Sequence, residues 1–222
     1  MLLAAGGLWL SNASYPAGEK ALAALQSSSG VTVTAEDNMT VFMPEEVAQG
    51  LIFYPGGFVE HTAYAPLLRS LAEEGWLCVL TEMPFDLAVL NMNAADGIRE
   101  RFPQVDSWAI GGHSLGGAIA ASYAAGHAED FDALVLLAAY ATEDLNGTDM
   151  TVYSIYGSED QVLNRDKYAQ YRKNLPANTI EVVLEGGNHA QFGDYGHQKG
   201  DGTAALSPEE QQQKTVAVLN GR

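Results

Sequence analysis

The chain has 222 residues, of which 28 are acidic and 11 are basic, so its formal net charge at pH 7 is −17. A surface this acidic repels phosphate backbones and anionic membrane surfaces, which argues against a nucleic-acid-binding protein. The single cysteine, Cys78, excludes an internal disulfide and any cysteine-rich zinc site. The length suits one α/β domain, which we expect to span residues 15–222.

The chain begins with an apolar segment, Met1–Leu10 (MLLAAGGLWL), which opens a stub over residues 1–14. It is much shorter than the ~18–20 residues of a membrane-spanning helix, and it lacks the basic start of a secretory signal. Two interpretations stay open. The segment is the remnant of a membrane anchor or signal, which would tether an extracytoplasmic protein to a membrane, or it packs locally on the domain of a cytoplasmic protein.

Short apolar runs predict eight β-strands, several of them almost continuous in Val, Ile, Leu and Ala, which is typical of strands covered on both faces. The first two have no helix between them and predict an antiparallel hairpin. The predicted strands are Val31–Thr34, Met39–Met43, Leu51–Tyr54, Trp76–Leu80, Ser107–Gly111, Ala133–Ala138, Thr151–Tyr156 and Ile180–Leu184.

Amphipathic stretches between these runs predict helices, and the alternation predicts a mostly parallel, doubly wound sheet. Ser207 and Glu210 form a capping-box pattern at the start of the last helix. Only 12 residues separate Ala138 from Thr151, which leaves no room for a helical cap over the carboxyl edge of the sheet. The predicted helices are Pro16–Ser27, Thr62–Glu74, Asn93–Arg101, Leu115–His127, Arg165–Asn174 and Pro208–Asn220.

The segment Gly112-His113-Ser114-Leu115-Gly116-Gly117 fits the pattern G-x-S-x-G and lies between a predicted strand and a predicted helix. In that context the pattern predicts a tight turn that presents a nucleophilic serine, Ser114, at the carboxyl edge of the sheet. The residues two before and two after the serine must be small, and both are glycine. The amide of Leu115, at the helix N-terminus, would point at an oxyanion formed there.

A serine hydroxyl is a poor nucleophile without a base, and the usual chain order of such a site is nucleophile, acid, base. His189 is the preferred base, because it follows the last predicted strand in the loop Glu185–Ala190. His127 falls at the end of a helix, and His197 lies eight residues further on in a Gly-, Asp- and Tyr-rich loop.

The acid is expected after the strand Thr151–Tyr156, where Glu159 and Asp160 are adjacent. Asp160 is preferred, because its shorter side chain lies one residue deeper in a tight turn, and Glu159 is interpreted as a solvated turn residue. A carboxylate here would accept from His189 Nδ1–H and hold the ring in the tautomer that catalysis needs. Asp194 is the substitute candidate.

A second oxyanion donor is expected in the glycine-containing loop after Leu51–Tyr54, where the amide of either Gly57 or Phe58 is in reach. His61, in the same loop, is a candidate pocket residue or an exposed one. His189 and His197 lack zinc-motif spacing, and no G-x-G-x-x-G opens the first βα unit, so we expect neither a metal nor a cofactor.

At this point the sequence resembles the α/β-hydrolase superfamily over most of its length, roughly from Tyr15 to Asn220. It looks similar to the small capless bacterial "α/β-hydrolase fold-5" carboxylesterases and to dienelactone-hydrolase-like proteins. The segments that carry the resemblance are LIFYPGGF (residues 51–58), WAIGGHSLGG (108–117), YGSED (156–160) and GGNHAQFGDYGHQKGDG (186–202). Dienelactone hydrolases use a cysteine nucleophile, whereas Ser114 stands at that position here.

The resemblance implies Ser114 as nucleophile, Asp160 as acid and His189 as base. We therefore expect a serine hydrolase that cleaves small or short-chain carboxylic esters through an acyl-enzyme, with a small-molecule ester as its partner. The same three residues would serve a thioesterase, an acyltransferase or a peptidase. A further alternative is a catalytically silent hydrolase fold that acts as a binding module.

Overall fold

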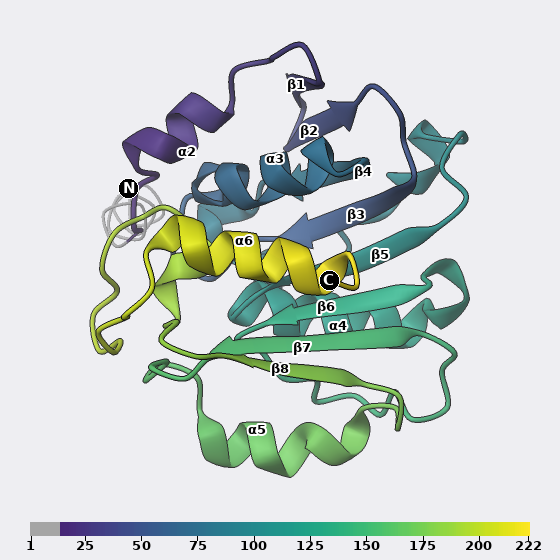
Figure 1. The fold of residues 1–222 in the computed structure, drawn as a ribbon. Coiled ribbons are helices and arrows are strands. Elements are labelled where there is room, and N and C mark those ends of the chain that lie inside the picture. Colours follow the sequence, from purple (N-terminus) through teal and green to yellow (C-terminus); the bar gives the residue numbers. More distant parts are fainter. Residues whose placement is uncertain (1–13) are drawn as a thin grey trace, which may run out of the picture.

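The computed structural model describes residues 14–222, and its eight strands form one mixed sheet with the order β1-β2-β4-β3-β5-β6-β7-β8 (Figure 1). All eight predicted strands are present. Their bounds are β1 Val31–Glu36, β2 Met39–Pro44, β3 Gln49–Tyr54, β4 Trp76–Thr81, β5 Trp108–His113, β6 Ala133–Leu137, β7 Thr151–Gly157 and β8 Ile180–Leu184.

The predicted hairpin is confirmed, because β1 pairs antiparallel with β2 in the register Val31↔Pro44. β2 also runs antiparallel to β4, and the remaining neighbours are all parallel. The carboxyl ends of the parallel strands therefore meet at one edge of the sheet. In an open sheet of this kind, that edge is where ligands bind.

Helices cover both faces of the sheet, as the doubly wound prediction requires. One face packs against α2 (Glu19–Ala24), α3 (Ala65–Glu73) and α6 (Pro208–Leu219), and the opposite face packs against α4 (Leu115–Gly126). α5 (Arg165–Tyr171) joins β7 through a hydrogen bond between Tyr168 and Ser154, 2.8 Å apart. The capping box of α6 is confirmed, since Ser207 accepts from the Glu210 amide while the Glu210 side chain accepts from the Ser207 amide.

The predicted helix Asn93–Arg101 is wrong, because that segment forms turns with one short 3₁₀ helix at Arg99–Arg101. The hydroxyl of Tyr54, from β3, donates to the Met92 carbonyl and accepts from the Ala95 amide at 2.9 Å each. These bonds replace helical backbone pairing. Gly97 adds a left-handed turn, at φ +72°, which ends any helical run.

No helix covers the connection between β6 and β7, so the absence of a helical cap there agrees with the prediction. None of the described helices is both long and apolar enough to span a membrane. The predicted anchor or signal remnant, Met1–Leu10, lies outside the described residues and stays a prediction.

Candidate active site

Ser114 stands at the turn between β5 and α4, and the glycines around it allow the backbones to approach closely. A Cβ on Gly116 would lie 2.2 Å from the Pro55 carbonyl oxygen, and one on Gly112 would lie 2.4 Å from the Tyr54 carbonyl oxygen. A Cβ on Gly117 would lie 2.7 Å from the Ala139 Cβ. Each position therefore excludes any larger residue, as the G-x-S-x-G pattern predicts.

The close approach at Gly116 leads to a stability prediction. Gly116→Ala should lower the free energy of unfolding by about 3 kcal/mol or more, because the methyl group meets two backbone carbonyls that cannot move independently. Gly126→Ala is the matched control in the same helix, since a Cβ there meets nothing within 4 Å and alanine favours helix. Urea unfolding of both variants checks this, and equal midpoints would contradict it.

Three non-glycine residues adopt left-handed backbone conformations at adjacent strand ends. Ser114 has φ 52° after β5, Phe58 has φ 57° in the loop after β3, and Ala138 has φ 48° after β6. Each such residue costs free energy, and strained residues of this kind cluster at functional sites. At Ser114 the strained conformation occurs where the backbone changes direction between the end of β5 and the start of α4.

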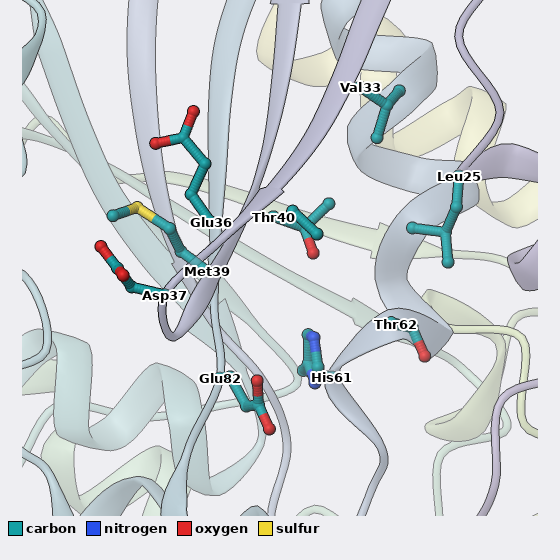
Figure 2. A pocket seen from close by; sticks show the side chains of 10 residues that line it. Leu25, Val33, Glu36, Asp37, Met39, Thr40, His61, Thr62 and Glu82 are labelled. Carbon is teal, nitrogen blue, oxygen red and sulfur yellow. The ribbon is translucent and has the colours of Figure 1, made fainter.

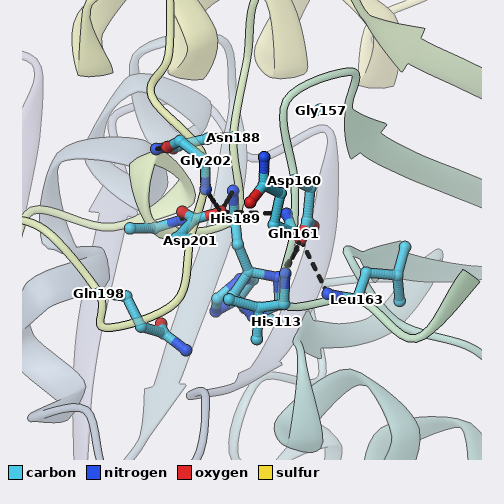
Figure 3. Close-up of polar contacts among 12 residues, drawn as sticks. His113, Gly157, Asp160, Gln161, Leu163, Asn188, His189, Gln198, Asp201 and Gly202 are labelled. Atoms are coloured by element: carbon cyan, nitrogen blue, oxygen red, sulfur yellow. Dashed lines mark hydrogen bonds and ion pairs between the residues drawn. The ribbon is translucent and has the colours of Figure 1, made fainter.

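His189 and Asp160 form a buried pair at the carboxyl ends of β8 and β7 (Figure 3). His189 Nδ1 lies 2.9 Å from Asp160 Oδ2, and the two side chains are 1% and 0% exposed. The other carboxylate oxygen, Oδ1, accepts from the amides of Val162 and Leu163 at 2.9 and 2.8 Å. His189 Nε2 is buried and has no hydrogen-bond partner among residues 14–222.

The surroundings of Asp160 keep it ionised. Burial raises the pKa of this carboxyl, but the hydrogen bond and charge of His189, together with the amides of Leu163 and Val162, hold the pKa below its ordinary value. The carboxylate therefore has the electrostatic character needed to fix a histidine tautomer and to stabilise its protonated form.

Two residues that the sequence analysis did not single out, Asp201 and Gln211, hold the base loop in place. Asp201 accepts from the Ala190 amide at 2.9 Å and from the His189 and Gln161 amides at 3.3 Å each, so it joins the base loop to the acid loop (Figure 3). Gln211, from α6, accepts from the Asn188 amide and donates to its carbonyl. Only tertiary contacts identify these side chains, since no sequence pattern marks them.

Ser114 and His189 line the same cavity, which has a volume of about 240 Å³. Its other walls are mostly small or apolar, and include Leu115, Ala118 and Ala139. The structure thus places the predicted serine and the predicted histidine at one concave, largely apolar site, with Asp160 behind the histidine.

The two candidates for the second oxyanion donor, the Gly57 and Phe58 amides, differ in their hydrogen bonding. The Phe58 amide donates to the Asp86 carbonyl at 2.8 Å, so it is already engaged. The Gly57 amide has no acceptor among the described residues, and a Cβ on Gly57 would lie 2.9 Å from the Leu115 side chain. Leu115 opens α4, where backbone amides lack intrahelical acceptors. The Gly57 and Leu115 amides are therefore the two predicted donors that have no acceptor among the described residues.

The alternative candidates lie elsewhere. Glu159 is exposed, as expected of a solvated turn residue, and His197 is exposed as well. His127 Nδ1 lies 2.9 Å from the Tyr123 carbonyl at the end of α4. Asp194 accepts from the Ala21 amide, at the start of α2, and so helps to hold that helix. Cys78 is buried in β4, in keeping with its apolar neighbours.

His61 lines a different cavity of about 350 Å³, beside the β1–β2 hairpin, together with Glu36 and Glu82 (Figure 2). Burial lowers the pKa of His61. Within residues 14–222, no group of three histidine, cysteine or carboxylate side chains is arranged to hold a metal. His61 is thus a pocket residue, but of a pocket other than the one that contains Ser114.

Comparison with solved structures shows the same fold in several hydrolases. A predicted CIB-like hydrolase from Thermoplasma acidophilum aligns with a TM-score of 0.61 and 16% identity, over 87% of this chain and 100% of that chain. Est1E from Butyrivibrio proteoclasticus aligns with a TM-score of 0.61 and 16% identity, over 87% of this chain and 98% of that chain. The carboxylesterase CesB (YbfK) from Bacillus subtilis aligns with a TM-score of 0.62 and 11% identity, over 97% and 99%.

A search of the curated proteins found no match. The family model described as "Alpha/beta hydrolase family" matches residues 50–213. That range includes the β5–Ser114–α4 turn, the Asp160 turn and the His189 loop. With the sheet order and the sequence model in agreement, this chain belongs to the alpha/beta hydrolase family.

Proposed function

We propose that this protein is a serine hydrolase that cleaves small or short-chain carboxylic esters through an acyl-enzyme intermediate. The observation that carries the proposal is the buried Asp160–His189 pair: His189 lines the cavity that also contains Ser114, and its Nε2 has no hydrogen-bond partner among the described residues. A binding module has no need of a buried histidine that is hydrogen-bonded to a carboxylate and lines the same cavity as a strained serine. The family membership and the esterase folds among the similar structures support a hydrolase.

In the proposed reaction, Ser114 Oγ attacks the ester carbonyl carbon while His189 Nε2 takes the hydroxyl proton. The amides of Gly57 and Leu115 donate to the oxyanion of the tetrahedral intermediate. The C–O bond to the alcohol then breaks, and the alcohol leaves with the proton held on His189. Water, deprotonated by His189, attacks the acyl-enzyme; the acyl C–O bond breaks, His189 returns the proton to Ser114 Oγ, and the acid leaves. Asp160 stabilises the charged imidazolium throughout.

The experiment that tests this function is intact-protein mass after incubation with a fluorophosphonate. A single adduct on wild type is expected, since only a base-activated serine reacts with this class of reagent. Absence of an adduct on folded wild type would refute the proposal and favour the silent binding module. A panel of esters, thioesters, amides and acyl acceptors then separates an esterase from a thioesterase, a peptidase or an acyltransferase.

The cavity dimensions predict a preference for short acyl chains. A volume of about 240 Å³ with walls such as Tyr140, Val162 and Leu163 holds a small acyl or alcohol group, and no helix encloses a longer chain above it. Rates on p-nitrophenyl esters should therefore fall with acyl length, by about tenfold or more in kcat/KM between butyrate and laurate. Greater activity on long-chain triglyceride than on short esters would contradict this prediction.

A further inference from the structure

His113, the residue before Ser114, is a buried histidine to which the proposed reaction assigns no proton transfer. Its side chain is 1% exposed, and its Nδ1 lies 2.8 Å from the Tyr64 hydroxyl. Its Nε2 has no hydrogen-bond partner in the described part of the chain. An apolar side chain could fill the same space without leaving a ring nitrogen buried and unpaired, which is a rare and costly arrangement. Packing alone therefore does not explain the histidine.

The hydrogen bonds of Tyr64 assign the tautomer of His113. The Tyr64 hydroxyl accepts from the Gly56 amide at 3.0 Å, and the one proton it carries is then directed to His113 Nδ1. The proton of His113 is therefore on Nε2. The opposite tautomer would leave the hydroxyl proton without an acceptor, whereas Nε2 lacks a partner in both, so the opposite tautomer is the less favourable of the two.

The surroundings of His113 also keep it uncharged. Burial, and then the proximity of His189, hold the pKa of His113 well below its ordinary value of 6.5. Burial likewise raises the pKa of Tyr64. The rings that face His113 are those of Tyr64, His189 and Phe192, at centroid distances of 5.6, 4.5 and 5.6 Å, and none of them carries a fixed charge. The nearest carboxylate in this network, Asp160, is bonded to the far side of His189.

The hydrogen bonds that join Gly56, Tyr64 and His113 thus link the neighbours of the Gly57 amide, of Ser114 and of the His189 ring. Gly56 precedes the Gly57 amide, and His113 precedes Ser114 and packs against the ring of His189 (Figure 3). A Cβ on Gly56 would lie 2.6 Å from the Tyr64 hydroxyl oxygen and 2.8 Å from His113 Nδ1, so the three groups are in tight contact. No other described hydrogen bond joins the Gly56 loop to the histidines.

We propose that Tyr64 and His113 are positioning residues. Their hydrogen bonds to each other and to Gly56 hold the Gly57 amide, Ser114 and the His189 ring in the relative positions that ester hydrolysis needs. This inference rests on the proposed function. Neither residue touches the reacting atoms, and both act through the groups that do. Correct placement to within a fraction of an ångström is worth one to two orders of magnitude in rate.

Two near-isosteric substitutions at His113 separate hydrogen bonding from packing. His113→Asn keeps an acceptor close to the position of Nδ1, whereas His113→Leu has almost the same shape and no acceptor. We expect kcat on a short ester to fall by about 10–100-fold in the leucine variant, with the asparagine variant retaining several times more activity. KM should change less than kcat in both. Equal activity in the two folded variants would overturn the proposal.

The hydroxyl is tested by Tyr64→Phe, with Tyr195→Phe as the matched control. Tyr195 is a buried neighbour, 6.4 Å from Tyr64 between ring centroids, whose hydroxyl bonds Gln198 instead of the histidines. Tyr64→Phe should lower kcat about tenfold and leave KM within about twofold, while the control stays near wild type. If the two variants have the same kcat, the proposal fails. The comparison of Tyr64→Phe with Tyr195→Phe still tests the proposal if His113→Leu does not fold.

Nitrogen-15 NMR of the imidazoles gives a readout that does not depend on turnover. His113 should remain neutral and protonated on Nε2 as the pH falls through 6.5, the ordinary pKa of a histidine. Tyr64→Phe, but not Tyr195→Phe, should shift the ring signals of both His113 and His189. A charged or Nδ1-protonated His113, or unmoved His189 signals, would overturn the proposal. If wild type forms no fluorophosphonate adduct, the proposed function fails. The spectra still decide whether the hydrogen bonds of Tyr64 and His113 position His189.

Discussion

Replacing Ser114 with alanine should lower kcat on short esters by about 10⁴-fold or more and abolish the fluorophosphonate adduct. The reason is that, among residues 14–222, no other serine or threonine lines the cavity of His189. Folding should be unaffected, since alanine carries the same Cβ and meets the same left-handed backbone as serine. The free energy of unfolding should stay within about 0.5 kcal/mol of wild type. Steady-state kinetics, intact mass and a thermal melt check the three parts.

The control for this variant is Ser122→Ala, in the same helix. The Ser122 hydroxyl donates to the Glu143 side chain at 3.5 Å, and Ser122 is not among the described residues that line the cavity. It should keep wild-type kinetics and the adduct. An adduct that persists in Ser114→Ala would show that another residue is the nucleophile, and peptide mapping of the labelled protein would then identify it.

Replacing Asp160 with asparagine should lower kcat by about 10³–10⁴-fold while preserving the shape of the site. The asparagine side chain can turn its amide N–H toward His189 Nδ1, which places the imidazole proton on Nε2. The ring then has no lone pair for the hydroxyl proton of Ser114. Glu159→Gln, one residue away and exposed, is the control and should stay within about twofold of wild type. The reverse result would assign the acid to Glu159.

The same carboxylate makes a prediction for stability against pH. The pKa of Asp160 is depressed in the folded protein, so its contribution is present above the unfolded value of about 3.8 and is lost as pH falls through the folded value. The difference in unfolding free energy between wild type and Asp160→Asn should be constant above about pH 5 and should shrink as pH falls below 3.8. A difference that grows toward acid pH would show that the carboxylate is unfavourable in the fold.

Local patterns account for much of the architecture. Apolar runs located all eight strands, because a strand covered on both faces needs an apolar side chain at nearly every position. The helix predicted over Asn93–Arg101 failed for a non-local reason, since the hydroxyl of Tyr54 takes the amide and carbonyl that a helix would have paired. No sequence pattern within residues 93–101 could predict hydrogen bonds to a tyrosine about 40 positions earlier.

The sequence alone determined the eight strands, the turn around Ser114 and the short lists of candidate acids, bases and amides, because these depend on periodicity and on the small residues of one tight turn. The tertiary structure decided which members of those lists meet. It joined Asp160 to His189, engaged the Phe58 amide with Asp86, and brought Tyr64 and Asp201 to the histidines. Such contacts join residues between 12 and 49 positions apart, and only the assembled sheet sets the distances between their strands and loops.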